Sequence, residues 1–383
     1  MNFKPVGIKA IAVSFPSIIR TNDYYRTYYP DLVAKAEEKT LARTFSVAQS
    51  NSDNKAADIW TEEMTPYLSD PFRGTVERRV FSPEESALSI SDRAARDVLE
   101  AAKLGPEDID LMLVATIFPD RVGPGDAAFL ARELGLQGAA WNLESTCSSA
   151  LAALQTASAM VRAGEYRNVL VVICTNYSRF TDKNDTLSFL SGDGAGAFVV
   201  SSLEGDRGIL GTQIINTAST CKTFYNELTA DETGNPQIFI RARKGAGKIL
   251  GETAVPLVQE CCQKAVKAAG VSLDEIDFFA FNTPTAWYTN VCTRALGIDR
   301  DRTLNLNPLY ANIGPMLPVA NLYHGAESGK IRENDLVLVY TIGSVSNAAA
   351  SVMRWGKVAL GPAPAPPITS AAQLDPSLET ARV

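Results

Sequence analysis

The sequence of 383 residues predicts a duplicated, layered α/β fold, and three observations support this prediction. First, LGPEDIDLMLVATIFPD (104–120) and VSLDEIDFFAFNTPTAW (271–287) share the order of an acidic turn, an apolar strand and a polar loop. Second, each stretch leads into a helix-like segment that ends in a similar phrase, ARELGL (131–136) or TRALGI (293–298). Third, strands alternate with helices in both halves, which is typical of sheets covered on both faces. The match between the halves indicates an internal repeat.

The later elements keep the same order in each half. A further strand is expected at AAWNLEST (139–146) and at TLNLNPLY (303–310), and a small-residue helix start follows each of them. A charged turn and a buried strand come next, at YRNVLVVICT (166–175) and ENDLVLVYTIG (333–343). The predicted organisation has three parts: an N-terminal half over 1–202, a C-terminal half over 203–360, and a flexible tail rich in proline and alanine over 361–383.

Composition and charge exclude several classes of protein. With 46% hydrophobic and 21% charged residues, the chain can bury a large core. A net charge of −7 argues against binding to nucleic acid, and a single histidine without CxxC spacing argues against a zinc site. The N-terminus, MNFKPVGIKAIAVSFP, lacks the apolar stretch of a signal peptide, and no window reaches the roughly 20 apolar residues of a membrane helix. We therefore expect a cytoplasmic protein with reduced thiols and no membrane partner.

One cysteine stands where an apolar run becomes an alanine-rich, helix-forming one. Cys147 lies in NLESTCSSALAAL (142–154), and the repeat places Asn312 opposite it, so both are expected at the entrance to a central helix. The free N–H groups and positive dipole end of a helix N-terminus can lower the pKa of a thiol, which favours a nucleophile. Because cysteines beside apolar runs are more often core residues, position alone leaves both roles open for Cys147. The core role is expected for four others, Cys174, Cys261, Cys262 and Cys292.

Four ordered motifs resemble the thiolase superfamily, in its ketoacyl synthase III branch. They are STCSSALAAL (145–154), SGDGAGAFVV (191–200), YANIGPMLPVA (310–320) and TIGSVSNAAASVMRW (341–355). The resemblance implies a thiolase-like, five-layer α-β-α-β-α fold, and the last motif is nearest to the long-chain condensing relatives that join two acyl thioesters. It also implies that Cys147 takes an acyl group from coenzyme A or an acyl carrier protein as substrate, without a further cofactor. The N–H groups of Cys147 and Ser344 would then bind the oxyanion that forms when the thiolate attacks.

The chain departs from the family pattern at the usual catalytic histidine. The family carries a catalytic triad of cysteine, histidine and asparagine. By resemblance, the position of its histidine is occupied here by Asn282, and the position of its asparagine by Asn312. An amide can donate a hydrogen bond to a carbonyl or enolate oxygen, but it cannot accept a proton at neutral pH. The only histidine, His324, is expected on the order of 18 Å from the site along a helix. Glu144 is a candidate replacement base for Cys147, and an ion pair at a subunit interface is the alternative for its side chain.

The missing histidine changes the expected function. Polarisation of a thioester by Asn282 remains available, whereas steps that need a base become harder. Simple acyl transfer through Cys147, either between thioesters or from a thioester to an amine, is therefore favoured, in secondary metabolism. Two alternatives stay open: a 3-oxoacyl-ACP synthase III-type enzyme that forms a carbon–carbon bond, and a catalytically silent partner subunit. The retained cysteine counts against the silent subunit, and the lost histidine counts against condensation.

The same resemblance suggests residues that contact substrate and partners. The loop at 117–126 crosses the dimer interface in relatives, so we expect a homodimer. The charges of this loop, Asp120 and Arg121, favour a polar or carboxylated acyl group, with solvated loop charges as the alternative. The carrier-docking arginine of relatives falls on Trp287. Residues 30–70 exceed the matching part of compact relatives and are expected to form a lid or a substrate-shaping insert. A basic patch could replace that arginine in binding an acidic carrier or the phosphates of coenzyme A, and it consists of Arg241, Arg243, Lys244 and Lys248. The alternative is that these charges form a solvated face.

Overall fold

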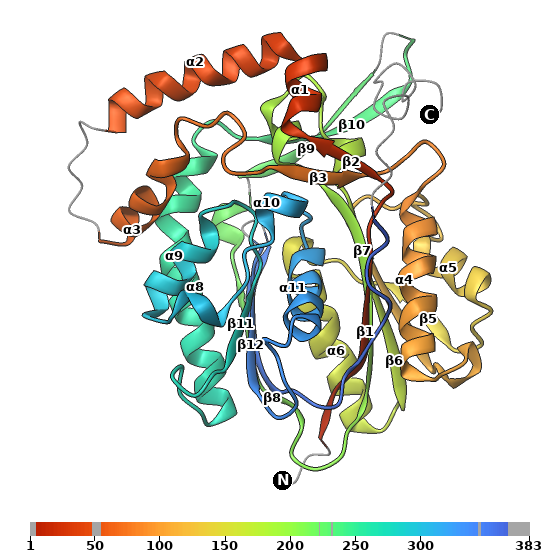
Figure 1. Cartoon of the computed structure of the whole chain (residues 1–383). Helices are drawn as coiled ribbons and strands as arrows, with labels where there is room; N and C mark the ends of the chain where they lie inside the picture. Colours follow the sequence, from red (N-terminus) through yellow and green to blue (C-terminus); the bar gives the residue numbers. More distant parts are fainter. Residues whose placement is uncertain (1–4, 48–54, 222, 231–232, 344–345, 367–383) are drawn as a thin grey trace.

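The structure is a computed structural model of the chain and describes residues 5–47, 55–221, 223–230, 233–343 and 346–366 (Figure 1). Two mixed sheets stand side by side, and their strands have related orders. The N-terminal sheet has the order β14-β1-β7-β6-β4-β5, and the C-terminal sheet has the order β11-β12-β13-β8. The first sheet contains β1 (Val6–Ser14), β4 (Leu111–Thr116), β5 (Ala139–Asn142), β6 (Asn168–Asn176), β7 (Asp193–Ser202) and β14 (Ala359–Leu360). The second contains β8 (Gly208–Asn216), β11 (Phe278–Phe281), β12 (Leu336–Ile342) and β13 (Asn347–Arg354).

The predicted duplication is visible in the strand pairing. The series β1-β7-β6-β4 is antiparallel, antiparallel and parallel, and the series β8-β13-β12-β11 repeats those directions. The parallel bridge between Phe279 and Thr303 stands where β5 pairs with β4 in the first sheet. Because the order and the directions agree, the two halves share one topology.

Three layers of helix cover the two sheets, as Figure 1 shows. The helices are α4 (Ala87–Ala102), α5 (Asp126–Leu134), α6 (Ser149–Ala163), α8 (Ala246–Ala269), α9 (Tyr288–Leu296) and α11 (Met316–Glu327). Helices α6 and α11 lie between the sheets, α4 and α5 cover the outer face of the first sheet, and α8 and α9 cover that of the second. This arrangement confirms the five-layer α-β-α-β-α fold.

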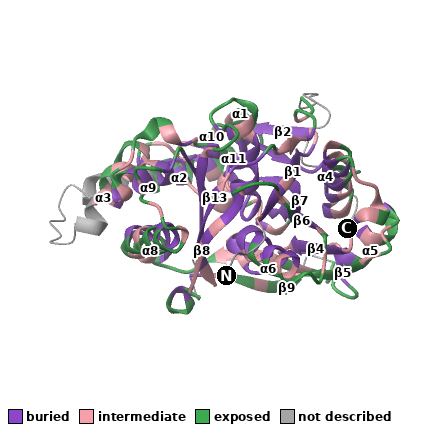
Figure 2. Ribbon diagram, turned by 90° about the horizontal axis from the view of Figure 1, so that it is seen from below, coloured by how far each residue is buried: buried purple, intermediate pink, exposed green. Residues whose placement is uncertain are grey.

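Alternation along the central strands explains why both faces of a sheet are covered. In β6, Val169 and Val171 belong to the core between the sheets, whereas Leu170 and Val172 belong to the core under α4. A strand that is apolar at every position must bury both faces. Seen from below, the buried residues accordingly concentrate in the sheets and the central helices (Figure 2).

The predicted insert packs on both halves. It contains α2 (Pro30–Val47), α3 (Lys55–Met64) and the 3-10 turn Thr65–Tyr67, and it follows α1 (Asn22–Tyr28). Helix α3 packs against α8 and α9 of the C-terminal half, and α2 lies near Phe189 of the N-terminal half. The strands β2 (Ile18–Thr21) and β3 (Glu77–Val80) pair at its base. Trp60 of α3 meets Trp287 edge to face, with 5.8 Å between the ring centroids. A hairpin that the sequence did not suggest, β9 (Phe224–Ala230) with β10 (Pro236–Ala242), lies outside the layers.

The first residues of the predicted flexible tail are anchored. The Gly361 N–H donates to the Ile11 carbonyl at 2.8 Å, and the Tyr323 hydroxyl donates to the Gly361 carbonyl at 3.0 Å. Just before them, β14 pairs with β1, so the end of the predicted C-terminal half lies in the N-terminal sheet. Residues 367–383 of the predicted tail lie outside the described residues.

Candidate active site

Cys147 lies in a tight turn directly before the central helix α6. The 3-10 turn Thr146–Ser148 precedes α6, and Thr146 has a left-handed backbone with φ +47°. A threonine adopts that conformation only where its surroundings impose it. Here the Ser149 hydroxyl donates to the Thr146 carbonyl at 2.7 Å and accepts from the Ser145 N–H at 2.8 Å. These two hydrogen bonds hold the turn that carries the thiol against Ser149, the first residue of α6.

The C-terminal half braces this turn through the connection between β12 and β13. The Ser148 hydroxyl donates to the Asn347 carbonyl at 2.6 Å, and the Asn347 amide donates to the Ser145 hydroxyl at 2.8 Å. A side chain at Gly343 would clash with the Asn347 carbonyl and approach the Ser148 hydroxyl, so glycine is required there. Ser344, the predicted second oxyanion donor, lies outside the described residues, between Gly343 and the braced Asn347. Its role stays a prediction.

Tyr177 is the neighbour of Cys147 that the sequence did not reveal. Tyr177 opens the short helix α7 (Tyr177–Phe180) after β6, and its Oη lies 3.8 Å from the Cys147 Sγ. The hydroxyl also lies against Gly314, where an added Cβ would be 2.5 Å from it. The sequence does contain a signal for this residue. Tyr177 is a polar residue directly after a buried strand that has a parallel neighbour, and ligand sites of α/β sheets lie at that end of such strands.

Both predicted asparagines meet at the backbone of Gly314. Asn282 directly follows β11 and is 1% exposed, and its Nδ2 donates to the Gly314 carbonyl at 3.2 Å. The Asn312 Oδ1 accepts from the Gly314 N–H at 2.9 Å. Since Tyr177 also contacts Gly314, the structure brings Cys147, Tyr177 and the two asparagines to one place. The buried Oδ1 of Asn282 has no hydrogen-bond partner among the described residues.

The thiol is in an environment that favours its neutral form. Burial raises the pKa of the Cys147 thiol, the hydrogen bond with Tyr177 opposes this shift, and the Glu144 charge adds to it. The expected lowering of the thiol pKa is therefore wrong in direction, because burial is the largest influence and raises the pKa, and because Cys147 lies in the 3-10 turn before α6 rather than in the first turn of that helix. Burial also raises the pKa of Tyr177 well above its ordinary value, so this phenol stays neutral.

Glu144 and His324 have different surroundings. The Glu144 carboxylate is exposed and accepts a hydrogen bond from the Thr146 N–H, so it lies on the turn that carries the thiol. Its charge acts on both Cys147 and Tyr177. His324 lies in α11, where its Nε2 is 3.1 Å from the Tyr310 hydroxyl and its Nδ1 is 3.1 Å from the Glu327 carboxylate. These contacts fit an ordinary helix residue and leave Glu144 as the candidate base.

The predicted substrate-contacting charges before α5 are engaged within the chain. The Asp120 carboxylate accepts from the Leu88 N–H at 2.8 Å, near the start of α4. The Arg121 guanidinium lies over the Phe129 ring, 5.6 Å from its centroid. Beside them, burial raises the pKa of Asp126 to about 6. Asp120 thus supports a helix end, and no contact of either residue with Cys147 occurs among the described residues.

The predicted carrier-docking position is covered. Trp287 is 6% exposed and packs between Trp60 and Tyr67 of the insert. The insert therefore acts as a cover over the start of α9 and prevents Trp287 from presenting its side chain to a carrier. The indole Nε1 of Trp287 has no hydrogen-bond partner in the described part of the chain.

The predicted basic patch is smaller than the sequence suggested. Arg241 forms ion pairs with Glu227 at 2.7 Å and with Asp182 at 3.0 Å, so its charge is neutralised. Lys248 is exposed and 3.8 Å from Glu252 on α8. Arg243 and Lys244 are exposed and form no ion pair with a described residue. The patch thus offers two cations rather than four.

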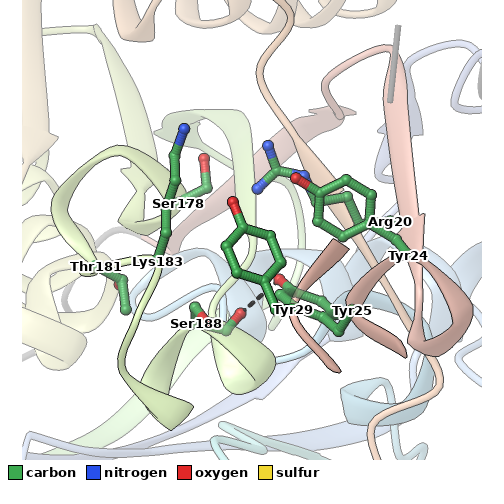
Figure 3. A pocket seen from close by; sticks show the side chains of 8 residues that line it. All are labelled: Arg20, Tyr24, Tyr25, Tyr29, Ser178, Thr181, Lys183 and Ser188. Atoms are coloured by element: carbon green, nitrogen blue, oxygen red, sulfur yellow. Dashed lines mark hydrogen bonds between the residues drawn. The ribbon is translucent and has the colours of Figure 1, made fainter. Parts of the chain in front are cut away.

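A separate small cavity lies beside α7, and Figure 3 shows it. Its volume is about 10 Å³, enough for about one water molecule. Burial and the neighbouring Arg20 lower the pKa of Lys183 to about 8. The cavity is lined by Arg20, Tyr24, Tyr25, Tyr29, Ser178, Thr181, Lys183 and Ser188. It shares no residue with the Cys147 site.

Comparisons with known proteins agree with the fold and the motifs. A family model described as 3-oxoacyl-[acyl-carrier-protein (ACP)] synthase III matches residues 141–218, and its C-terminal counterpart matches 266–355. The β-ketoacyl-ACP synthase III of Brucella suis is 30% identical over 311 residues, which are 79% of this chain and 92% of that protein.

Solved structures extend the likeness to the whole fold. The 3-oxoacyl-ACP synthase III of Aquifex aeolicus has a TM-score of 0.72 at 26% identity, over 91% of this chain and 100% of that one. A variant of OleA from Xanthomonas campestris shares the fold, with a TM-score of 0.71 at 20% identity over 93% of this chain and 99% of that one. The fold and site thus define a thiolase-superfamily protein. Within that superfamily, the chain belongs to the 3-oxoacyl-ACP synthase III family of acyl-transferring and condensing enzymes.

Among its described residues, no helix has the length and apolar character needed to cross a membrane.

Proposed function

We propose that the protein is a thioester-dependent acyltransferase. It takes an acyl group from an acyl-coenzyme A or acyl-carrier-protein thioester onto Cys147 and passes it to an acceptor that carries an N–H group. The observation that carries this proposal is the buried, unpartnered Oδ1 of Asn282. A buried acceptor without a partner costs about 1–3 kcal/mol, and the N–H of an incoming amine would remove that cost. An amide oxygen can orient such a nucleophile although it cannot take its proton.

The loading step uses groups that surround the thiol. The Cys147 proton passes to the Glu144 carboxylate, and the resulting thiolate attacks the thioester carbonyl carbon. The new carbon–sulfur bond forms while the carbonyl electron pair moves to oxygen, and the oxyanion accepts a hydrogen bond from the N–H of Cys147. The carbon–sulfur bond of the donor then breaks, and the departing thiolate recovers the proton from Glu144. The balance leaves an acyl-enzyme and a free donor thiol.

Condensation is the second candidate, and the names of the relatives favour it. The relatives are described as β-ketoacyl-ACP synthases. In a condensation, the amides of Asn282 and Asn312 would donate to the enolate oxygen that forms as a malonyl thioester loses carbon dioxide. The Nδ2 of Asn312 has no hydrogen-bond partner among the described residues, so it is available for this contact. Transfer to an amine remains our first choice because the site contains no histidine base.

The assembly and the partners complete the proposal. We propose a homodimer that serves secondary metabolism, with Arg243 and Lys244 as the cations that meet an acidic carrier or coenzyme A phosphates. The exposure of both side chains supports this contact. Light scattering should give twice the chain mass of 41.2 kDa, and a monomer with full activity would contradict the dimer.

Mass spectrometry of the intact protein tests the proposed function. After incubation with a panel of acyl thioesters, the peptide containing residues 142–154 should gain the acyl mass. Cys147→Ala should abolish this gain, whereas Cys221→Ala, which removes an exposed thiol elsewhere, should leave it unchanged. Acylation that persists without Cys147 would overturn the proposal. Release of carbon dioxide and a β-ketoacyl product from malonyl thioesters, faster than transfer to amines, would favour condensation.

A further inference from the structure

We infer that Tyr177 is a catalytic residue whose hydroxyl donates a hydrogen bond to the Cys147 sulfur and stabilises it as a thiolate. This inference rests on the proposed function, because Cys147 is the acyl acceptor only under that proposal. It assigns to a tyrosine part of the work for which the chain has no histidine at the site.

The geometry leaves the tyrosine hydroxyl one partner. Its Oη lies 3.8 Å from the Cys147 Sγ, within hydrogen-bond range for sulfur, and has no other hydrogen-bond partner among the described residues. Tyr177 is 9% exposed, and its ring lies against Gly314, which has a left-handed backbone with φ +49° and no side chain. A side chain at that glycine would displace the hydroxyl. The contact between oxygen and sulfur is therefore held by packing.

The protonation state makes Tyr177 the donor. Burial, followed by the neighbouring Cys147, keeps the pKa of the phenol well above its ordinary value, so the O–H proton is retained at neutral pH. A neutral phenol can donate to a thiolate but cannot remove the proton of a thiol. Tyr177 thus stabilises the anion, and the proton must leave to another group.

The other groups that act on the thiol do not replace this contact. Glu144 disfavours the thiolate through its negative charge, and burial disfavours it as well. A hydrogen bond from the N–H of Cys147 itself favours the thiolate. Among the described residues, Glu144 and Tyr177 are the titratable groups that act on Cys147, and only Tyr177 favours the anion. Hydrogen bonds to a charged partner are stronger than those between neutral groups, so this contact strengthens when the thiol ionises.

The step is balanced without an added reactant. The Cys147 proton moves to Glu144 in the loading step, the sulfur keeps its electron pair, and Tyr177 donates without losing its proton. When the sulfur attacks the thioester, the pair enters the new carbon–sulfur bond and the hydrogen bond from Tyr177 weakens. The tyrosine is then free to rotate its O–H towards an oxygen of the bound acyl group.

The test measures the pH dependence of Cys147 alkylation, which requires no acyl transfer. Iodoacetamide is added over a range of pH, and modification of the peptide containing residues 142–154 is followed by mass spectrometry. Tyr177→Phe should move the midpoint upward by about one pH unit, so that alkylation below the midpoint slows about tenfold while the high-pH plateau is unchanged. Tyr323→Phe removes another buried hydroxyl, one that donates to the Gly361 carbonyl, and should leave the profile unmoved.

A second substitution tests the direction of the effect. Replacing Tyr177 with 3,5-difluorotyrosine keeps the ring and strengthens the donor, so the midpoint should move downward. Profiles of the phenylalanine and difluorotyrosine variants that both superimpose on the wild type would overturn the inference. If the profiles move but no thioester acylates Cys147, the inference about the sulfur stands and the proposed function fails. If acylation occurs and the profiles do not move, the proposed function stands and the role of Tyr177 is refuted.

Discussion

Replacing Asn282 with leucine should separate its function from its contribution to folding. The side chain is buried, its Nδ2 donates to the Gly314 carbonyl at 3.2 Å, and its Oδ1 has no partner among the described residues. Leucine has a similar volume and no polar atom. The substitution therefore removes one hydrogen bond and one buried acceptor that lacks a partner.

The two effects on stability oppose one another. Loss of the bond to Gly314 costs about 0.5–1.5 kcal/mol, and removal of the unpartnered Oδ1 returns about 1–3 kcal/mol. We expect the free energy of unfolding of Asn282→Leu to lie between about 0.5 kcal/mol below and about 2.5 kcal/mol above that of the wild type. Acyl transfer should fall about 100- to 1000-fold, because a donor to the developing charge and an acceptor for the nucleophile are both lost.

Asn321→Leu is the matched control. Asn321 is also a buried asparagine with an unpartnered Oδ1, but its Nδ2 donates to the carbonyls of Phe281 at 3.0 Å and Leu304 at 3.3 Å. Its replacement removes two hydrogen bonds instead of one, so it should destabilise the protein more while the folded enzyme transfers acyl groups normally. Thermal unfolding and single-turnover transfer from acylated Cys147 measure the two quantities. A large loss of stability with normal transfer in Asn282→Leu would refute the reasoning.

Three further predictions concern the thiol and its turn. Because burial holds the pKa of Cys147 above its ordinary value, alkylation of the free thiol should rise about tenfold per pH unit between pH 7 and 8, and a plateau of the alkylation rate below pH 8 would contradict this. Glu144→Gln should slow loading at least tenfold because it removes the base. The same substitution should speed alkylation of Cys147, because a negative charge beside the thiol disappears. If both rates changed in the same direction, Glu144 would be excluded as the base. Gly314→Ala should lower the melting temperature and abolish loading, since its Cβ would lie 2.5 Å from the Tyr177 hydroxyl, and normal loading by mass spectrometry would show that the contact is dispensable.

The fold was predictable because the same order of elements occurs in both halves of the sequence. A turn, an apolar strand and a helix recur in both halves, and the parallel bridge between Phe279 and Thr303 shows that even the weakest strand pair has its counterpart. The hairpin β9–β10 has no equivalent among the described residues of the other half, so the repeat could not indicate it. The anchoring of Gly361 depends on the distant Tyr323 hydroxyl, a tertiary contact that composition does not reveal.

Those residues of the candidate site that lie within a recognisable sequence motif could be predicted. Cys147 and Asn312 come from matching junctions of the repeat, and Asn282 follows a strand whose end the pattern marks. Tyr177 is separated from Cys147 by 30 residues, and their contact depends on how β6 packs beside α6. Burial depth is likewise a tertiary property, which is why the pattern indicated the wrong direction for the thiol pKa.

The charges available at the site restrict the acceptor further. Tyr177, Asn282 and Asn312 are neutral at pH 7, and among the described residues the carboxylate that acts on the thiol is that of Glu144, which accepts a hydrogen bond from the turn that carries Cys147. A hydroxyl acceptor must lose its proton as it attacks, which needs a base beside the acceptor. A neutral amine attacks with its own lone pair and can release the proton afterwards, so it needs only an acceptor that orients its N–H. The buried Asn282 Oδ1 supplies that acceptor, and amines should therefore outcompete alcohols of the same size in transfer from acylated Cys147.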